Sequence, residues 1–296
     1  MMVSIIIPTY NRPALLQRAV ASALAACPGD GEVIVVDDRS DTAVKALYKV
    51  DDHPRLRILT NTGDKGAAGA RNHGVAQALG EIVMFLDDDD TLVAGYPIRV
   101  SRAADQGADW GFSSRQMVVG DQPPDIQTPQ AEGSLLSEKT PLQKQIAAFS
   151  AGFWVRRDVF VKLGGIAPDQ VNDEDTDFCC RLVAGGHRAW FEPEAGCVVY
   201  RAYEIGPDVA PQLTLVFDPV VASQCYARTF VRNEAAFHND PAARWFLLFR
   251  ALRACARNQA DNVARDLLAG LPLGVFKLRG YFYWQTKRLG KRLGFR

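Results

Sequence analysis

The sequence predicts an α/β fold in which a mostly parallel central sheet is flanked by helices and followed by a C-terminal helical extension. Short β-branched runs alternate with helical patterns over roughly the first ninety residues, and helical periodicity dominates beyond about residue 206. The chain has 296 residues, of which 48% are apolar, so it can bury a full core. We expect one domain over residues 1–205 and a helical extension with a basic aromatic tail over residues 206–296.

The strands of the expected sheet are short, predominantly apolar runs at residues 3–7, 32–36, 55–59 and 81–86. Pro8 is expected to end the first strand. Apolar residues at helical spacing predict a helix between the first two strands, and a second helix is expected over residues 67–79. Continuous apolar strands favour a parallel sheet that is covered on both faces. In such sheets, ligands bind beyond the carboxyl ends of the strands.

Polar segments follow three of these strands and read PTYNR (residues 8–12), DDRSD (37–41) and DDDDT (87–91). Carboxylates at a strand end suit Mg²⁺ or Mn²⁺, which also binds substrate phosphates, so the pattern indicates a nucleotide-diphosphate site. The alternative is a solvated turn in which Asp90 caps the next helix. The second acidic pair, Asp37 and Asp38, favours the ligand site. No GxxxxGK[ST] loop is present, and GDKGAAG (63–69) lacks the spacing of a dinucleotide fingerprint.

Five segments in order resemble the motifs of family 2 glycosyltransferases, which have the GT-A fold. They read VSIIIPTYNR, VIVVDDRSD, AGARNHG, GEIVMFLDDDD and NDEDTDFCCRLVAGG and fall within roughly residues 3–200. The resemblance implies an inverting, DxD-containing enzyme that transfers one sugar, of hexosyl or N-acetylhexosaminyl type, from a nucleotide-diphosphate donor that is expected to be a UDP-sugar. Its acceptor would be a hydroxyl group of a glycan or a lipid-linked molecule, in bacterial-type surface polysaccharide or lipopolysaccharide synthesis.

Two alternatives remain open. A sugar-1-phosphate nucleotidyltransferase would use a related sheet, but it is expected to open with a glycine-rich loop, and IIIPTYNR contains no glycine. A pseudoenzyme that binds a nucleotide-sugar without transferring the sugar is the other alternative. The absence of a QxxRW motif argues against a processive polysaccharide synthase.

The resemblance also implies roles for the residues that match the motifs. Asp89 would bind the divalent cation, Mn²⁺ or Mg²⁺, that bridges the diphosphate. Arg71 would close the base pocket, and the alternative for Arg71 is a surface ion pair with an acid such as Asp64. Asp87 and Asp88 would hold the ribose. The residues implied to bind the nucleotide are Pro8, Thr9, Tyr10, Asp38, Arg71, Asp87 and Asp88.

A second acidic cluster, NDEDTDF (172–178), begins a predicted helix that ends at Gly185 and Gly186. Acids at a helix N-terminus are stabilised by the helix dipole, so capping alone is one interpretation. The resemblance implies instead that Asp175 is the catalytic general base, with Glu174 beside it, within reach of the acceptor hydroxyl. Thr176 stands where the family usually has an aromatic residue, which predicts unusual acceptor recognition.

The C-terminal segment is basic and aromatic. Leu267 to Arg296 hold seven of the 34 Lys and Arg residues and none of the 34 acids, although the net charge of the chain is zero. This composition suits contact with an anionic membrane surface through residues 275–296. The alternative is an aromatic helix packed on the body with a solvated basic end. No nucleic-acid recognition motif accompanies the charges, so no nucleic-acid partner is expected.

Further features predict where the protein resides. The N-terminal sequence lacks the features of a signal peptide, and no apolar stretch is long enough to span a bilayer. The six cysteines show no zinc-binding spacing, so buried, reduced thiols are expected. We therefore expect a cytoplasmic protein with peripheral contact to the inner face of the cell membrane. Residues 121–140, rich in Pro, Gln and Ser, are expected to form a mobile loop.

Overall fold

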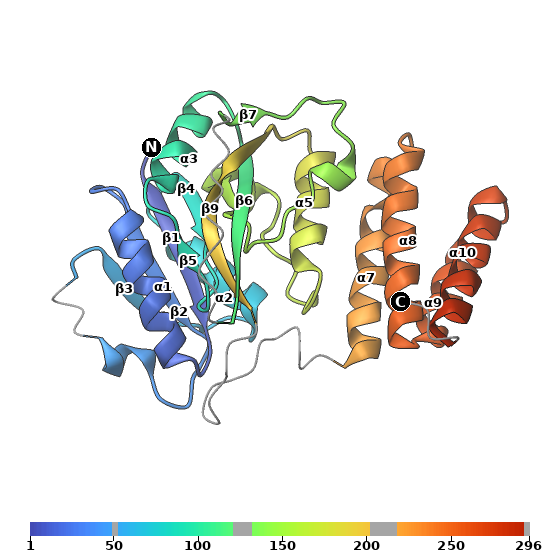
Figure 1. The fold of residues 1–296 in the computed structure, drawn as a ribbon, viewed down its shortest axis with the longest axis horizontal. Coiled ribbons are helices and arrows are strands. Elements are labelled where there is room, and N and C mark those ends of the chain that lie inside the picture. Colours follow the sequence, from blue (N-terminus) through green and yellow to red (C-terminus); the bar gives the residue numbers. More distant parts are fainter. Residues whose placement is uncertain (49–52, 121–131, 202–217, 293–296) are drawn as a thin grey trace. The chain divides into compact units, whose positions relative to one another are not determined.

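The computed structural model describes residues 1–48, 53–120, 132–201 and 218–292 (Figure 1). The chain divides into two compact units. The sheet unit comprises Met1–Thr140, Ala147–Pro168 and Gly185–Pro211, and the helical unit comprises Pro141–Ile146, Asp169–Ala184 and Gln212–Arg296. The boundary predicted at residues 205–206 lies outside the described residues and stays a prediction.

The sheet unit contains a mixed, mostly parallel sheet (Figure 1). Within the described ranges the strand order is β3-β2-β1-β4-β8-β6-β9-β5, and β7 also pairs with β9. Strands β1 to β4 are mutually parallel, and so are β6 and β9, whereas β5, β7 and β8 pair antiparallel with their neighbours. The strands are β1 (Val3–Thr9), β2 (Glu32–Asp37), β3 (Leu56–Thr60), β4 (Ile82–Phe85), β5 (Thr91–Leu92), β6 (Trp110–Val119), β7 (Ser134–Leu135), β8 (Trp154–Arg156) and β9 (Ala189–Arg201).

Helices cover both faces of the first strands. The helices of the sheet unit are α1 (Pro13–Ala26), α2 (Ala67–Gln77), α3 (Tyr96–Asp105) and α4 (Arg157–Lys162), with a short 3₁₀ turn η1 (Val44–Leu47). Val3 and Ile5 belong to the core cluster that α1 and α3 share with the sheet. Ile6 points to the opposite face, as alternation along a strand requires, and meets α2 at Gly74. A Cβ atom at Gly74 would lie 2.6 Å from Ile6 Cγ2, so glycine permits this close approach.

Strand β1 continues through Pro8, so the prediction that Pro8 ends the strand is wrong. Pro8 pairs in register with Val36 of β2. The pairing between β1 and β4 ends earlier, at Ile6 with Phe85. Proline is tolerated here because alternate residues of a parallel strand face the same neighbour, and Pro8, like Ile6, faces the side on which β4 has already ended.

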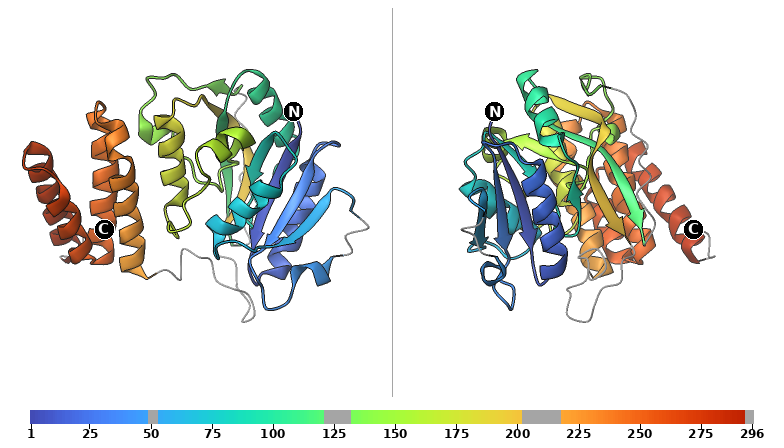
Figure 2. Two further views of the ribbon diagram at one scale, coloured as in Figure 1. Left: turned by 180° about the vertical axis from the view of Figure 1, so that it is seen from behind. Right: turned by 60° about the vertical axis from the view of Figure 1, so that its left-hand side comes forward.

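The helical unit contains η3 (Leu142–Lys144), α5 (Glu174–Ala184), α7 (Pro219–Asn233), η4 (Glu234–Phe237), α8 (Pro241–Asn258), α9 (Asp261–Gly270) and α10 (Val275–Arg292). Helix α8 lies between α7 and α10 (Figure 2). The apolar pattern from Trp245 to Leu271, read as helical from the sequence, is broken at Gln259, which adopts a left-handed conformation with φ of 57° and ends α8. Leu247, Leu252 and Trp284 are among the buried residues of the unit's core.

Helix α10 forms despite the glycines that weaken its helical propensity. Gly280 faces the core, where an added Cβ would lie 3.1 Å from Leu268 Cδ2 and 3.2 Å from Leu248 Cδ2. Glycine therefore lets α10 approach α8 and α9 closely. Among the described helices, none is both long and apolar enough to cross a membrane.

Other predictions from the sequence have mixed outcomes. All six cysteines are buried, as expected, and none of them forms a disulfide within the described ranges. Of the predicted loop at residues 121–140, residues 121–131 lie outside the described ranges, and Ser134–Leu135 form β7. The mostly parallel sheet, its flanking helices and the C-terminal helical region confirm the predicted fold class.

Candidate active site

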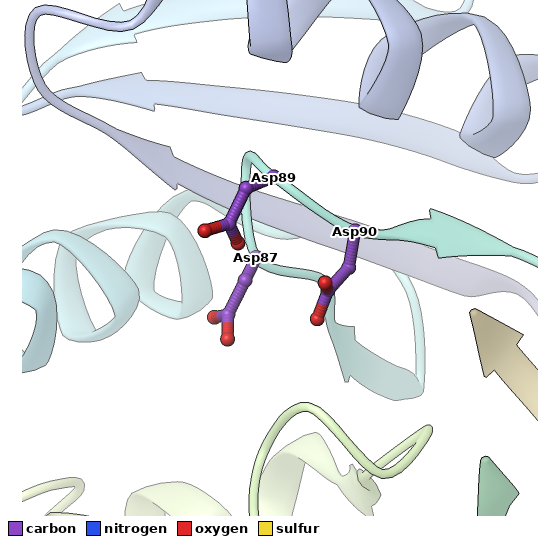
Figure 3. A group of neighbouring side chains, drawn as sticks. All are labelled: Asp87, Asp89 and Asp90. Carbon is purple, nitrogen blue, oxygen red and sulfur yellow. The ribbon is translucent and has the colours of Figure 1, made fainter. Parts of the chain in front are cut away.

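The acidic run that follows β4 folds into a tight turn, in which the Asp90 N–H donates to the Asp87 carbonyl oxygen at 3.1 Å. The side chains of Asp87, Asp89 and Asp90 extend to the same side of this turn (Figure 3). Each offers a carboxylate oxygen, and these oxygens lie within 4.8 Å of one another. The turn lies beyond the carboxyl ends of β1, β2 and β4, where α/β sheets of this kind bind ligands.

Asp88 has a different environment from its three neighbours. Its buried carboxylate accepts hydrogen bonds from Thr9 Oγ1 at 2.7 Å and from Arg12 Nη1 at 3.0 Å. Burial raises the pKa of Asp88 to about 6, although Arg12 and Thr9 favour its ionised form. Asp88 therefore ties the acidic turn to the end of β1. Its ribose-binding role stays a prediction.

Asp90 joins the acidic group, although the sequence did not assign it to the site. One carboxylate oxygen accepts from the Tyr200 N–H at 3.2 Å, and the other, Oδ2, is buried with no hydrogen-bond partner among the described residues. Burial, followed by the charges of Asp87 and Asp89, raises the pKa of Asp90 to about 8. Asp90 does not cap a helix, because β5 follows it and Gly95 is the N-cap of α3.

The donor set of this turn fits a hard divalent cation. Mg²⁺ and Mn²⁺ prefer oxygen ligands and are bound by carboxylates together with substrate phosphates. Asp87, Asp89 and Asp90 supply such ligands. Asp90 Oδ2, to which no described group donates a hydrogen bond, is a buried acceptor that a cation would satisfy. The sequence predicted Asp89 as the metal ligand, and the geometry adds Asp87 and Asp90 as candidates.

Arginines surround the acidic turn. Arg71 is buried rather than on the surface, and its Nη2 donates to Asp87 Oδ1 at 2.7 Å. Its guanidinium also lies 4.9 Å from the centroid of the Phe149 ring. Arg12 lies 3.5 Å from Asp89 Oδ2. These cations offset part of the repulsion between the carboxylates. The negative charge of Asp90 is the least compensated, because neither arginine pairs with it.

The residues predicted to line the base pocket lie at the ends of β1 and β2. The Asp38 N–H donates to the Thr9 carbonyl oxygen at 2.8 Å, which links the two strand ends. The buried Asp38 carboxylate accepts from Asn61 Nδ2 at 2.6 Å and from the Gly66 N–H at 2.7 Å. Each of its oxygens keeps a further lone pair for a nucleobase donor. Pro8 is buried, and the half-buried Tyr10 ring lies 4.8 Å from Lys65 Nζ.

The second acidic cluster lies in the helical unit, and the structure divides its residues into two kinds. Asp173 is buried, has a φ of 66° and pairs with Arg250 of α8. Asp177 is buried and accepts from Arg181 at 3.2 Å and from Asn233 at 3.0 Å. Both therefore have structural partners.

Glu174 and Asp175 are half-buried at the first turn of α5. Asp175 Oδ1 accepts from the Thr176 N–H at 2.6 Å, so this residue takes part in the turn that opens the helix. Their exposure leaves Glu174 and Asp175 as the acids of this cluster that a substrate can reach. The catalytic role of either residue stays a prediction.

The fold is also found among solved structures of other proteins. The S. aureus protein TarS, solved in complex with UDP-GlcNAc, superposes with a TM-score of 0.72 at 17% sequence identity and covers 100% of this chain and 93% of that chain. This similarity concerns the fold alone. The sequence model described as Glycosyl transferase family 2 matches residues 4–164, which is more than half of the chain, so the chain belongs to this family.

Characterised relatives match shorter segments. The chain is 40% identical over 109 residues to the GalNAc(5)-diNAcBac-PP-undecaprenol beta-1,3-glucosyltransferase of Campylobacter jejuni, covering 35% of each protein. It is 40% identical over 95 residues to the UDP-Glc:alpha-D-GlcNAc-diphosphoundecaprenol beta-1,3-glucosyltransferase WfgD of Escherichia coli, covering 31% of this chain and 37% of that protein. These matches span about a third of the length of the two relatives.

Proposed function

We propose that this glycosyltransferase moves one hexosyl or N-acetylhexosaminyl group from a UDP-sugar to a hydroxyl group of a lipid-linked saccharide, with inversion at the anomeric carbon. The observation that carries the proposal is the acidic turn of Asp87, Asp89 and Asp90 at the carboxyl edge of a family 2 domain. The names of two relatives support the acceptor class, because both act on saccharides linked through a diphosphate to undecaprenol.

The nucleotide is assigned to the ends of β1, β2 and β4. Asp38, with Pro8 and Tyr10 beside it, is proposed to accept a hydrogen bond from uracil. Asp87 is proposed to hold the ribose together with Asp88, whose bonds to Thr9 and Arg12 fix the backbone of the turn. The remaining members of this pocket are Thr9 and Arg71.

The leaving group needs positive charge, since the UDP oxygen gains an electron pair as its bond to the sugar breaks. A divalent ion bound by Asp89, with Asp87 and Asp90, supplies that charge when it is present. The chain's own residues prepare the site, because Arg12 and Arg71 hold the carboxylates in a compact turn despite their mutual repulsion.

The hydroxyl group of the acceptor must lose its proton during transfer, which requires a general base. As the acceptor oxygen bonds to the anomeric carbon, its proton passes to the carboxylate of Asp175, and UDP departs from the opposite face of the sugar. Glu174 is proposed to orient the acceptor beside it. Such a base contributes about 100-fold to 10,000-fold to the rate, and alignment of the two substrates contributes in addition.

Transfer is tested with a panel of labelled UDP-sugars and undecaprenyl-diphosphate-linked saccharides, with UDP release measured alongside. The proposal predicts a labelled lipid product and one UDP per sugar transferred. Asp175→Asn is expected to lose transfer by at least about 100-fold while its affinity for the UDP-sugar stays the same. Asp158→Asn, the same change in the first turn of α4, is the matched control.

Other results would contradict the proposal in distinguishable ways. Formation of UDP-sugar from UTP and a sugar 1-phosphate would indicate a nucleotidyltransferase. Binding of the donor with neither transfer to any acceptor nor slow hydrolysis by water would indicate a pseudoenzyme. Full turnover by Asp175→Asn would remove that residue from the role of base.

A further inference from the structure

Helix α10 divides its aromatic residues between two environments. Phe276, Tyr283 and Trp284 pack inside the helical unit. The Tyr283 ring stacks on Phe249 with centroids 4.2 Å apart, and the Phe276 ring lies 4.0 Å from that of Trp245. These three aromatic residues therefore hold α10 on the unit and are not available to an external partner.

A different set of apolar side chains faces away from the unit. Val275, Leu278, Phe282 and Leu289 are all exposed, with 59% of Leu278 and 66% of Phe282 accessible. Their spacing of three, four and seven residues places them on one face of the helix. We call this set the outer face of α10. Exposed apolar residues that gather on one helix face indicate an interaction surface.

The charge of α10 limits the kinds of partner that fit. The helix carries six Lys or Arg residues and no acid. Of these, Arg288 is paired with Asp261 of α9, and Lys277 donates to backbone carbonyl oxygens of the helical unit. Arg279 is exposed and flanks the outer face, and its aliphatic stem allows its charged end to reach a polar boundary beside an apolar one. A second copy of the chain would present the same positive charges, so pairing two outer faces would bring like charges together.

We propose that the outer face of α10 docks in the plane of an anionic lipid surface. Its apolar side chains would enter the boundary between headgroups and acyl chains, and Arg279 beside them would contact the anionic headgroups, to which the net positive charge of the helix adds attraction. This binding does not depend on the proposed sugar transfer, because it uses no residue assigned to the donor, the metal or the base.

The proposal is tested by flotation of the purified full chain with vesicles of phosphatidylcholine, with and without phosphatidylglycerol. We expect flotation with the anionic vesicles and weakening by salt, since surface charges are screened. The double change Leu278→Gln and Phe282→Gln is expected to weaken binding by at least about tenfold. Val231→Gln is the matched control, because Val231 is an apolar residue of α7 with 61% exposure and lies off the outer face.

The charge contribution is tested separately with Arg279→Gln, which is expected to weaken binding roughly fivefold. Circular dichroism of every variant verifies that it is folded. Absence of flotation with anionic vesicles, or binding by the folded double variant equal to that of wild type, would overturn the proposal. A wild-type dimer that dissociates in the double variant would assign the outer face to a second copy and would also overturn it.

Failure of this proposal is separable from failure of the proposed function. Hydrolysis of UDP-sugar by water needs no lipid surface, and the double variant is expected to retain it unchanged. A protein that floats but does not use UDP-sugars would leave the membrane proposal standing and contradict the transfer proposal.

Discussion

At the residue scale, the four consecutive aspartates 87–90 differ in their partners. Asp88 turns toward Thr9 and Arg12, whereas the other three gather their carboxylates. The sequence predicts that the run lies at a strand end, because an apolar strand precedes it. It does not predict which aspartate turns inward, since that depends on the backbone bond between Asp90 and Asp87 and on the position of Arg12.

Arg12 is the cation that makes burial of Asp88 tolerable. Arg12→Met would leave the Asp88 carboxylate buried without a charged partner, and removal of one member of a buried pair costs about 3 kcal/mol or more. We expect the free energy of unfolding, measured by urea titration at neutral pH, to fall by this amount. Arg265→Met, at an exposed position of α9, should change it little. Equal effects of the two changes would show that Arg12 does not stabilise Asp88.

Asp173 predicts a pH dependence of stability. Burial raises its pKa from 3.8 to about 6 despite the neighbouring Arg250. Between these two values the folded state binds the proton more tightly than the unfolded state does. The stabilisation that the folded state gains from tighter proton binding at Asp173 is therefore fully present below pH 3.8 and is lost as the pH rises through about 6.

The change in stability across this window is on the order of 3 kcal/mol. Asp173→Asn cannot titrate, so we expect its free energy of unfolding to fall less steeply over the same pH range. The comparison uses slopes, so a constant loss from the unpaired Arg250 does not affect it. Parallel curves for variant and wild type would contradict the raised pKa of Asp173.

At the element scale, α5 is fixed at its start and along one side. Arg250 of α8 pairs with Asp173, immediately before the helix, and Asn233 of α7 donates to Asp177 within it. These contacts hold the turn that carries Glu174 and Asp175. The sequence identified this acidic cluster, but it could not separate the structural acids from the accessible ones. Arg250 and Asn233, which bind Asp173 and Asp177, lie more than fifty residues away along the chain.

Arg250 is therefore expected to position the turn that carries the proposed base, Asp175. Arg250→Met is expected to lower kcat for sugar transfer about tenfold through misalignment of the base, with little change in KM for the UDP-sugar. Arg253→Met, an exposed change on the same helix, is the control. A rise in KM with kcat unchanged would show that Arg250 acts on donor binding instead.

The elements also show how far sequence patterns reach. The first four strands could be predicted because each is a short run rich in apolar residues, and the structure has them within about two residues of the expected bounds. The break at Gln259 was missed because a non-glycine residue in the left-handed region carries no strong sequence signal. Strands β5 and β7 are two residues long and exist only through pairing with β9, so no local pattern predicts them.

At the scale of the whole molecule, the two units carry different parts of the proposed activity. The sheet unit holds the acidic turn and the nucleotide-binding strand ends, and the helical unit holds the proposed base and the outer face of α10. The family and fold were predictable because five motifs occur in order along the chain. The split of the C-terminal aromatic residues was not predictable, because it depends on which side of α10 packs on α8 and α9.

We propose that the acidic turn binds a UDP-sugar together with a divalent cation. The most direct measurement is the thermal stabilisation of wild type, Asp89→Asn and the exposed control Asp105→Asn by a panel of UDP-sugars, with and without Mn²⁺. We expect one UDP-sugar to stabilise wild type and the control in the presence of Mn²⁺, by about 2.7 kcal/mol at a hundredfold excess over Kd, and to have little effect on Asp89→Asn. Stabilisation that is independent of Mn²⁺ and unchanged in Asp89→Asn, or no stabilisation of wild type by any UDP-sugar, would contradict the claim.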